Sequence, residues 1–374
     1  MPLSASGTHI VDSIGNLFYL AGVVADKNEW SKGYFTASDV DTIKQNGGNI
    51  VEIHTIDFSF DVMPTKNVIN TAFFSNTLDP LVNLITSRGL YCIINFRDIT
   101  VRGSTQYMAN WMMDGHGYGS APYNTSTQQQ AAKDFYNLGN PLHNDNRAIW
   151  VSSWAWIANH YKDNQYVIFS PVNEPMNSIP FTTAEHPVYG QYYATFMEQT
   201  IDVIRATGAQ QVIFIDKPYS ASLWSDVKKV NRTNIVWEDH AYVDGGNTYA
   251  QWQTFVNQMV STFVQGFGQP LFIGEYATIP LTQTNWKVII ANMAAYLSDT
   301  TRFSGRQFHS WGMLYGENDS VAGDPTALTN TADNMYLIQA ILPGGTQPSS
   351  KNYTFDHFVV NGTIYTENPL GLSI

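Results

Sequence analysis

Two glutamates in this sequence each follow a short apolar run, and together they have the chemistry to cleave a glycosidic bond. Glu174 follows the Val-Ile-Phe run that starts at Val167 and stands beside the amide of Asn173, and Glu275 follows Pro270-Leu-Phe-Ile-Gly. Runs of this length are typical of strands buried on both faces. In a parallel α/β barrel, the side chains at the carboxyl ends of the strands carry the chemistry. Retaining hydrolysis of a glycoside needs two carboxyl groups at such a place.

An Asn-Glu-Pro tripeptide alone is a weak signal, because it also occurs by chance. Either glutamate could instead be a surface carboxylate or one half of an ion pair. Glu174 and Glu275 share the same context, however, since each ends a buried apolar run. We therefore predict that both are catalytic carboxylates, and this prediction requires a fold that brings two distant strand ends together.

Strand-like and helix-like segments alternate eight times along the chain. Strands are expected at residues 17–25, 50–54, 90–96, the start of 167–176, 212–215, 235–238, 271–274 and 307–311. Helices are expected at residues 36–45, 76–87, 147–162, 189–207, 220–229, 249–264, 286–297 and 331–341. Alternation indicates a parallel sheet, and eight repeats indicate closure. The sequence thus predicts an α/β fold, a single (β/α)8 TIM barrel over residues 1–342.

Two further segments stand apart from this repeat. Residues 98–146, after the third strand, form a long insertion rich in Gly, Asn, Ser and aromatic residues, and loops of this length are usually functional. Residues 343–350 read as a linker, and the Asn361-Gly362 pair suits the tight turn of a β-hairpin. We expect residues 343–374 to form this linker and hairpin and to pack on the barrel surface, being too short for a separate domain.

The composition narrows the possible partners. Of the 374 residues, 13% are charged and the net charge is −12, which disfavours nucleic acids and anionic membranes as partners. At low pH the carboxylates become neutral and few basic groups remain to repel one another, so the composition also suggests tolerance of acid. The single cysteine, Cys92, excludes an intrachain disulfide. The first residues lack the apolar region of a signal peptide; for a polymer-degrading enzyme we expect an extracellular, monomeric protein whose leader is absent from this sequence.

Taken in order, several segments resemble glycoside hydrolase family 5, the cellulase-like retaining barrels. They are His9-Ile-Val-Asp-Ser-Ile-Gly-Asn-Leu-Phe-Tyr-Leu-Ala-Gly-Val, Asp163-Asn-Gln-Tyr-Val-Ile-Phe-Ser-Pro-Val-Asn-Glu-Pro-Met, His240-Ala-Tyr, Ile273-Gly-Glu-Tyr and Trp311. Each segment alone is moderately specific for the family. Their occurrence in this order along nearly the whole chain is strongly specific for it. The resemblance implies a TIM barrel without a cofactor, acting on a polysaccharide.

The resemblance also implies roles for individual residues. Glu174 matches the acid/base and Glu275 the nucleophile. Asn173 matches the amide that holds the 2-hydroxyl of the sugar. His240 and Tyr242 match the pair that contacts the reacting sugar and orients the nucleophile, and a buried core histidine is the alternative for His240. Trp311 matches the aromatic floor beneath the sugar, with plain barrel packing as its alternative.

The sequence departs from the family at the second and third strands. Where the family has an arginine that braces the nucleophile, this chain has Glu52, followed by His54 on the same face of the strand. Where the family has a histidine on the third strand, Arg97 stands here. We infer that Arg97 could pair with Glu52 inside the barrel and reach toward Glu275 in place of the missing arginine. The alternative is that Arg97 points outward on a loop.

Other candidates carry weaker signals. Trp30, after the first strand, and Trp111, in the long insertion, are candidate aromatic walls of the cleft. A metal site is not expected, because the potential ligands of the insertion lack any regular ligand spacing; they are Asp114, His116 and His143.

These observations predict a retaining, endo-acting glycoside hydrolase that cleaves β-1,4-glucan chains by double displacement. A β-mannanase of the same mechanism is the first alternative, because contacts around the sugar 2-hydroxyl decide between them. A barrel that has lost catalysis and only binds polysaccharide is the second. The presence of both glutamates, Asn173 and Tyr242 speaks against the last reading.

Overall fold

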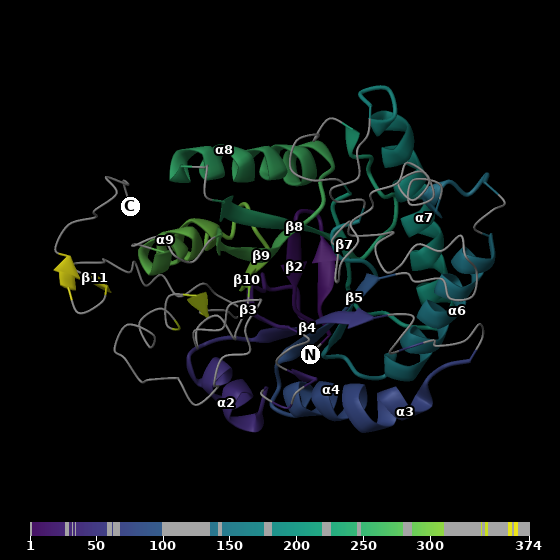
Figure 1. The fold of residues 1–374 in the computed structure, drawn as a ribbon, viewed down its shortest axis with the longest axis horizontal. Helices are drawn as coiled ribbons and strands as arrows, with labels where there is room; N and C mark the ends of the chain where they lie inside the picture. The colour runs from purple at the N-terminus through teal and green to yellow at the C-terminus, as the bar shows by residue number, and fades with distance from the viewer. Residues whose placement is uncertain are drawn as a thin grey trace, which may run out of the picture.

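Eight parallel strands close into a barrel in the computed structural model of this chain (Figure 1). Their order around the barrel is β10-β3-β4-β5-β6-β7-β8-β9, which is the order of the chain itself. The strands are β3 (Leu20–Ala25), β4 (Ile50–Asp57), β5 (Tyr91–Asp98), β6 (Val167–Ser170), β7 (Ile213–Asp216), β8 (Ile235–Asp244), β9 (Leu271–Ile279) and β10 (Gly305–Phe308). The predicted (β/α)8 barrel is confirmed, and each of its eight strands overlaps a segment expected from the sequence.

The residues that the structure describes cover most of the barrel but not all of its loops. The described residues are 2–26, 30–31, 33, 35–57, 62, 68–98, 135–140, 144–175, 182–218, 226–244, 248–279, 286–309, 338, 341–342, 358–360 and 363–365. Outside them lie Trp111, Trp311, most of the predicted 98–146 insertion and most of the predicted 220–229 and 331–341 helices. The side chains of a few residues at strand and helix ends, including Arg97, are also not described.

Helices surround the barrel on its outer side (Figure 1). They are α2 (Ala37–Gln45), α3 (Thr71–Phe73), η2 (Phe74–Leu78), α4 (Asp79–Thr86), α6 (Asn144–Tyr161), α7 (His186–Ala206), α8 (Tyr249–Met259), η5 (Val260–Gly266) and α9 (Trp286–Leu297). Thr248 begins α8 with a capping box completed by Gln251, so the backbone donors of its first turn are satisfied. Among the described residues, none of the helices combines the length and the apolar character that crossing a bilayer requires.

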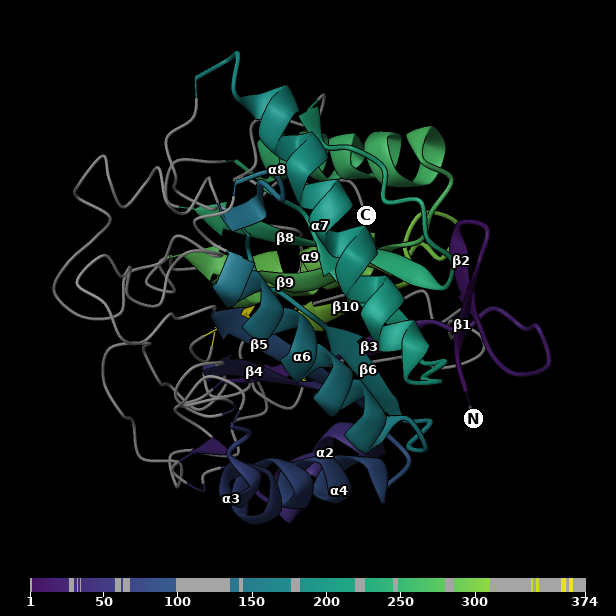
Figure 2. The same ribbon diagram turned by 90° about the vertical axis from the view of Figure 1, so that its right-hand side faces the viewer.

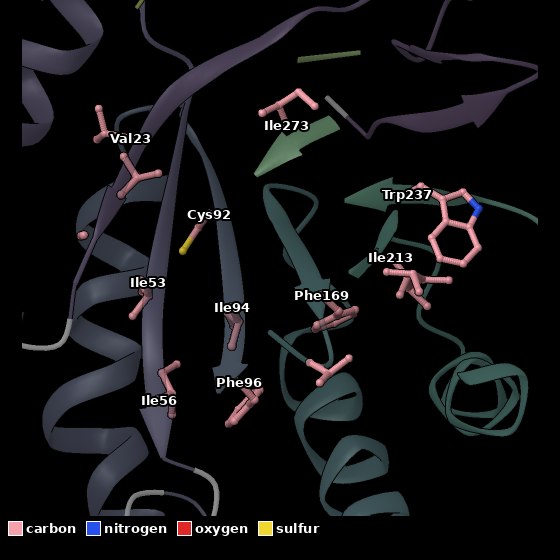
Figure 3. Close-up of a cluster of buried hydrophobic side chains, with 14 of the residues drawn as sticks. Val23, Ile53, Ile56, Cys92, Ile94, Phe96, Phe169, Ile213, Trp237 and Ile273 are labelled. Carbon is pink, nitrogen blue, oxygen red and sulfur yellow. The ribbon is translucent and has the colours of Figure 1, made fainter. Parts of the chain in front are cut away.

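The outer faces of the strands pack against these helices in one large apolar core (Figure 3). Two aromatic contacts illustrate this layer. Phe96 of β5 meets Trp154 of α6 edge to face at 4.9 Å, and Trp237 of β8 stacks on Phe263 of η5 at 4.8 Å. Cys92 lies buried in the same layer as a free thiol, as the sequence suggested. Every second side chain of each strand therefore points outward into this packing, and the side chains between them point into the barrel.

A second, smaller core fills the amino-terminal end of the barrel. Phe214 of β7 and Phe272 of β9 lie 4.8 Å apart although β8 separates their strands, so both point inward. The chain start covers this end as an antiparallel hairpin, β1 (Ser4–Ser6) and β2 (His9–Val11), which packs Leu3 and Ile10 on the same core. Figure 2 shows this hairpin at the end opposite the strand arrowheads. The sequence analysis predicted no strand before residue 17 and therefore missed this hairpin.

Near the other terminus, β11 (Phe358–Val360) pairs antiparallel with β12 (Thr363–Tyr365), the hairpin expected around Asn361-Gly362. Its packing on the barrel, and the division of the chain at residue 343, stay predictions. Because one apolar layer closes the amino-terminal end of the barrel, the inward polar side chains gather at the carboxyl end.

Candidate active site

Glu174 and Glu275 come together at the carboxyl end of the barrel. Glu174 lies in the loop that follows β6, and Glu275 lies within β9. One carboxylate oxygen of each and one ring nitrogen of His240 lie within 4.8 Å of one another. Retaining glycosidases separate their two carboxyl groups by about 5–5.5 Å, whereas inverting enzymes need about 6.5–9.5 Å to admit a water molecule. The close approach of the two carboxyl groups agrees with the shorter of these separations.

A β-bulge turns Glu275 into the barrel. The pairing of β8 with β9 shifts by one residue, because Asp239 pairs with Ile273 whereas His240 pairs with Glu275. Gly274 is the extra residue, and a Cβ there would lie 2.0 Å from Oε1 of the buried Glu238. Only glycine leaves room for that carboxyl group. Without the bulge, strict alternation from the inward Phe272 would point Glu275 outward.

Glu275 is held by a ring of donors. The hydroxyl of Tyr242 donates to Oε2 of Glu275. His54 places Nε2 at 3.2 Å from Oε1, and His240 places Nδ1 at 3.3 Å from Oε2. Burial alone would raise the pKa of Glu275, but the charges of His240, His309 and His54 outweigh it and lower the pKa to about 2. Glu275 is therefore ionised from weakly acidic pH upward, which is the state that nucleophilic attack would require.

Glu174 is held by different partners. Its Oε1 lies 2.8 Å from Nδ1 of His240, and its backbone N–H donates to Oδ2 of Asp216. The φ angle of Glu174 is 42°, in the left-handed region that costs a residue other than glycine about 1–3 kcal/mol. Asp216 lies at the end of β7 and also approaches Nε2 of His240 at 3.6 Å. Asp216 thus stabilises the strained backbone that presents the Glu174 carboxyl group.

His240 lies between the two glutamates and carries a positive charge there. Burial lowers the pKa of His240, but Glu275, Asp216 and Glu174 raise it well above its ordinary value. A protonated imidazole can donate from both nitrogens, so it contacts Glu174 and Glu275 on one side and Asp216 on the other. Its position keeps two carboxyl groups close together that would otherwise repel each other.

A polar layer lies inside the barrel next to Glu174 and Glu275. Glu52 is 1% exposed, and neither of its carboxyl oxygens has a hydrogen-bond partner among the described residues. Burial first, and then the charges of Glu238 and Glu275, raise the pKa of Glu52 well above its ordinary value. Glu238 accepts from the hydroxyl of Ser170 at 3.1 Å, and burial raises its pKa to about 7. Glu52 therefore points inward, and its surroundings favour the protonated form of its carboxyl group.

Several of the residues predicted from the sequence lie together at this site, and others do not. Asn173 is 2% exposed, and its Oδ1 has no partner within the described part of the chain. Trp30 was expected on the cleft wall, but it is 5% exposed and its indole N–H donates to the carbonyl of His54 at 3.0 Å. It therefore packs behind the site and supports β4. The expected roles of Arg97, Trp111 and Trp311 concern side chains outside the described residues.

The sequence analysis missed three residues that border this site, namely Asp26, Asp216 and His309. Asp26 directly follows β3, and Asp216 ends the apolar run Val212-Ile-Phe-Ile. These are the strand-end positions that drew attention to Glu174 and Glu275, and the same signal would have found them. His309 lies one residue after β10 and shares the inward face of Gln307. The sequence analysis considered only Trp311 at this strand end and did not predict a role for His309.

The sequence of this chain matches the family model described as cellulase (glycosyl hydrolase family 5) over residues 8–311. The chain belongs to glycoside hydrolase family 5. It is thus a glycoside hydrolase of the family that the sequence resembled. A curated relative, endoglucanase A of Butyrivibrio fibrisolvens, is 21% identical over 282 residues, which cover 74% of this chain. The chain spans only about half of that relative's length, 52%.

Solved structures share the family 5 barrel. Endo-glycoceramidase II from Rhodococcus sp. superposes with a TM-score of 0.63 at 15% identity, covering 82% of this chain and 75% of the other. A GH5-4 broad specificity endoglucanase from an uncultured bacterium superposes with a TM-score of 0.58 at 17% identity, covering 82% and 84%. At these identities the likeness concerns the fold, and the substrate must be argued from the site.

Proposed function

We propose that this family 5 member is a retaining, endo-acting hydrolase of β-1,4-glucan chains, with Glu275 as nucleophile and Glu174 as acid/base. The observation that carries the proposal is the spacing of the two carboxyl groups within 4.8 Å, joined by His240. The asymmetry of their surroundings supports the assignment of roles. Glu275 receives the hydroxyl of Tyr242 and the charge of three histidines, whereas Glu174 is held chiefly through its backbone and His240.

The reaction proceeds in two displacements. Glu275 attacks the anomeric carbon while Glu174 gives its proton to the departing glycosidic oxygen, so a covalent glycosyl-enzyme forms and the first sugar product leaves. Glu174, now ionised, takes a proton from a water molecule that attacks the anomeric carbon. The bond to Glu275 breaks, and the sugar keeps its original anomeric configuration. Asn173, buried beside Glu174, is proposed to hold the 2-hydroxyl of the sugar.

The substrate class rests on the relative. Endoglucanase A is named for cleavage within glucan, and this chain aligns with it over most of its own length. A polymer of that size is degraded outside the cell, so we propose an extracellular enzyme that acts as a monomer and needs no cofactor. A β-mannanase remains the alternative, because the mannan sugar differs at the 2-hydroxyl that Asn173 is proposed to hold.

A substrate panel tests this proposal. Carboxymethylcellulose, mixed-linkage β-glucan, mannan, xylan and a glycosylceramide are each incubated with the protein, and reducing sugar and product anomers are followed. We expect release from the glucans, with a fast fall in viscosity and β-anomers appearing first. Glu275→Gln and Glu174→Gln should each abolish release, whereas Glu198→Gln, a surface change, should not. Release from mannan alone would favour the mannanase, and no release from any substrate would favour a binding protein.

A further inference from the structure

Three side chains with metal-binding donors converge beside the catalytic pair. Asp26 follows β3, His54 lies within β4 and His309 follows β10, and these three strands are neighbours in the barrel. One donor atom of each residue lies within 4.8 Å of the other two. All three residues are buried, with exposed fractions of 8%, 3% and 8%. We propose that Asp26, His54 and His309 form a binding site for a divalent transition-metal ion, with Zn²⁺ as the best match.

The donor set fits this class of ion. Two imidazoles and one carboxylate are ligands that Zn²⁺ accepts, and three protein ligands leave a position open for water. Donors about 2.0–2.2 Å from a zinc ion lie about 3–4 Å from one another, and the donor atoms of these three residues already lie within 4.8 Å. The rings of His54 and His309 meet edge to face with centroids 5.5 Å apart. Small rotations of these rings would adjust the donor atoms to the distances that the ion requires.

An unsatisfied nitrogen provides a second, independent observation. Nδ1 of His309 is buried and has no hydrogen-bond partner among the described residues. A buried polar atom without a partner needs an explanation, and a bound ion or water provides one. The cluster therefore contains a donor for which the described protein atoms give no other use.

The surroundings of His54 resemble those of a metal ligand. Its Nε2 lies 3.2 Å from Oε1 of Glu275, and Nδ1 is the second ring nitrogen that could face an ion. Ligating histidines commonly direct their second nitrogen at a carboxylate, which fixes the tautomer and the ring. The indole N–H of Trp30 holds the His54 carbonyl at 3.0 Å and so fixes the backbone as well. The ligand is oriented before any ion arrives.

Such an ion would lie next to the nucleophile. The family resemblance leads one to expect a cationic arginine there, and β4 instead carries Glu52. Histidines bind a metal in their neutral form, so the ion would take the place of the charges of His54 and His309 on that side of Glu275. This consequence rests on the proposed function, whereas the existence of the site does not.

A second group of donors is the main competitor for an ion. Glu174, His240 and Glu275 also place their donor atoms within 4.8 Å of one another. These groups already satisfy one another in the catalytic arrangement, since His240 contacts both carboxylates. An experiment on metal binding must therefore separate the two groups.

Calorimetric titration of the untagged full chain with ZnCl₂, after removal of metals by a chelator, tests the site directly. We expect one zinc ion per chain. Asp26→Asn and His309→Ala should each weaken binding at least tenfold, with unchanged circular dichroism. His160→Ala, which removes a half-buried histidine stacked on Trp156, is the matched control and should bind as the wild type does.

Three results would overturn the site. They are the absence of zinc binding, equal binding by all three variants, and binding that Glu174→Gln abolishes while His309→Ala keeps it. The last result would locate the ion between the catalytic acids. If His309→Ala fails to fold, the near-isosteric Asp26→Asn decides alone. Glucan hydrolysis is measured separately, so an inactive protein that binds zinc would contradict the proposed function and leave the metal site standing.

Discussion

Removing the hydroxyl of Tyr242 tests how the nucleophile is kept ionised. In Tyr242→Phe the ring stays, and the hydroxyl that donates to Oε2 of Glu275 is lost. That donor stabilises the charged form of Glu275, so its removal must raise the pKa of that group. The histidines remain in place, and the pKa should rise from its value of about 2 without reaching that of a buried, unsupported carboxyl group.

The size of the shift follows from the strength of the bond. A hydrogen bond to a charged group contributes about 1.5–3 kcal/mol, and one pKa unit corresponds to about 1.4 kcal/mol. The acid limb of the kcat/KM profile, which reports the free enzyme, should therefore move up by about 1–2 pH units. The alkaline limb should stay, because that limb reports Glu174 as the proposed acid/base, and Tyr242 donates to Glu275.

Initial rates on a soluble β-glucan, taken across the acid range in short assays, measure both limbs. Each pH is checked for stability by returning the enzyme to neutral buffer and measuring activity again. Tyr249→Phe is the matched control, because its hydroxyl donates to a backbone carbonyl of α9 away from the site. An acid limb that stays within about 0.3 pH units of the wild type, or that moves equally in Tyr249→Phe, would refute the account of the nucleophile.

Three further predictions concern stability and positioning. Burial raises the pKa of Glu238 from 4.5 to about 7, so the folded state holds a proton that the unfolded state releases, and thermal stability should fall by about 1–3 kcal/mol as pH rises through this interval. Glu238→Gln should flatten that slope. Gly274→Ala should lower the free energy of unfolding in urea by about 1–3 kcal/mol, whereas Gly139→Ala, which meets only a flexible side chain, should not. Asp216→Ala unpairs the backbone N–H of Glu174, and kcat/KM on β-glucan should fall about tenfold, as expected for a buried bond worth about 1–2 kcal/mol.

The barrel was predictable because its signal is repeated. Each strand is an apolar run buried on both faces, and each helix has one apolar face, so eight weak signals support one another. The amino-terminal hairpin was not predictable in the same way. Its two strands have three residues each, and their pairing depends on Leu3 and Ile10 reaching the end of a barrel that the local sequence does not describe.

The sequence predicted the parts of the site in which a carboxylate follows an apolar strand. It did not predict the irregular backbone that orients those carboxylates. Glu174 and Glu275 were found from their context, but the geometry that presents them was not. Glu275 points inward because Gly274 forms a bulge, and Glu174 is presented by a backbone in the left-handed region. Both features depend on contacts with residues far along the chain, Glu238 and Asp216, and no local pattern encodes them.

The replacement of the family's arginine by Glu52 is compensated by histidines from three other places in the barrel. A guanidinium is charged at every accessible pH, whereas imidazoles exchange protons near neutrality. His54, His240 and His309 together lower the pKa of Glu275 as a cationic brace should. Glu52 avoids the cost of a buried charge by keeping its proton, which burial and Glu238 favour. The exchange therefore spreads the positive charge that faces Glu275 over several imidazoles instead of one guanidinium.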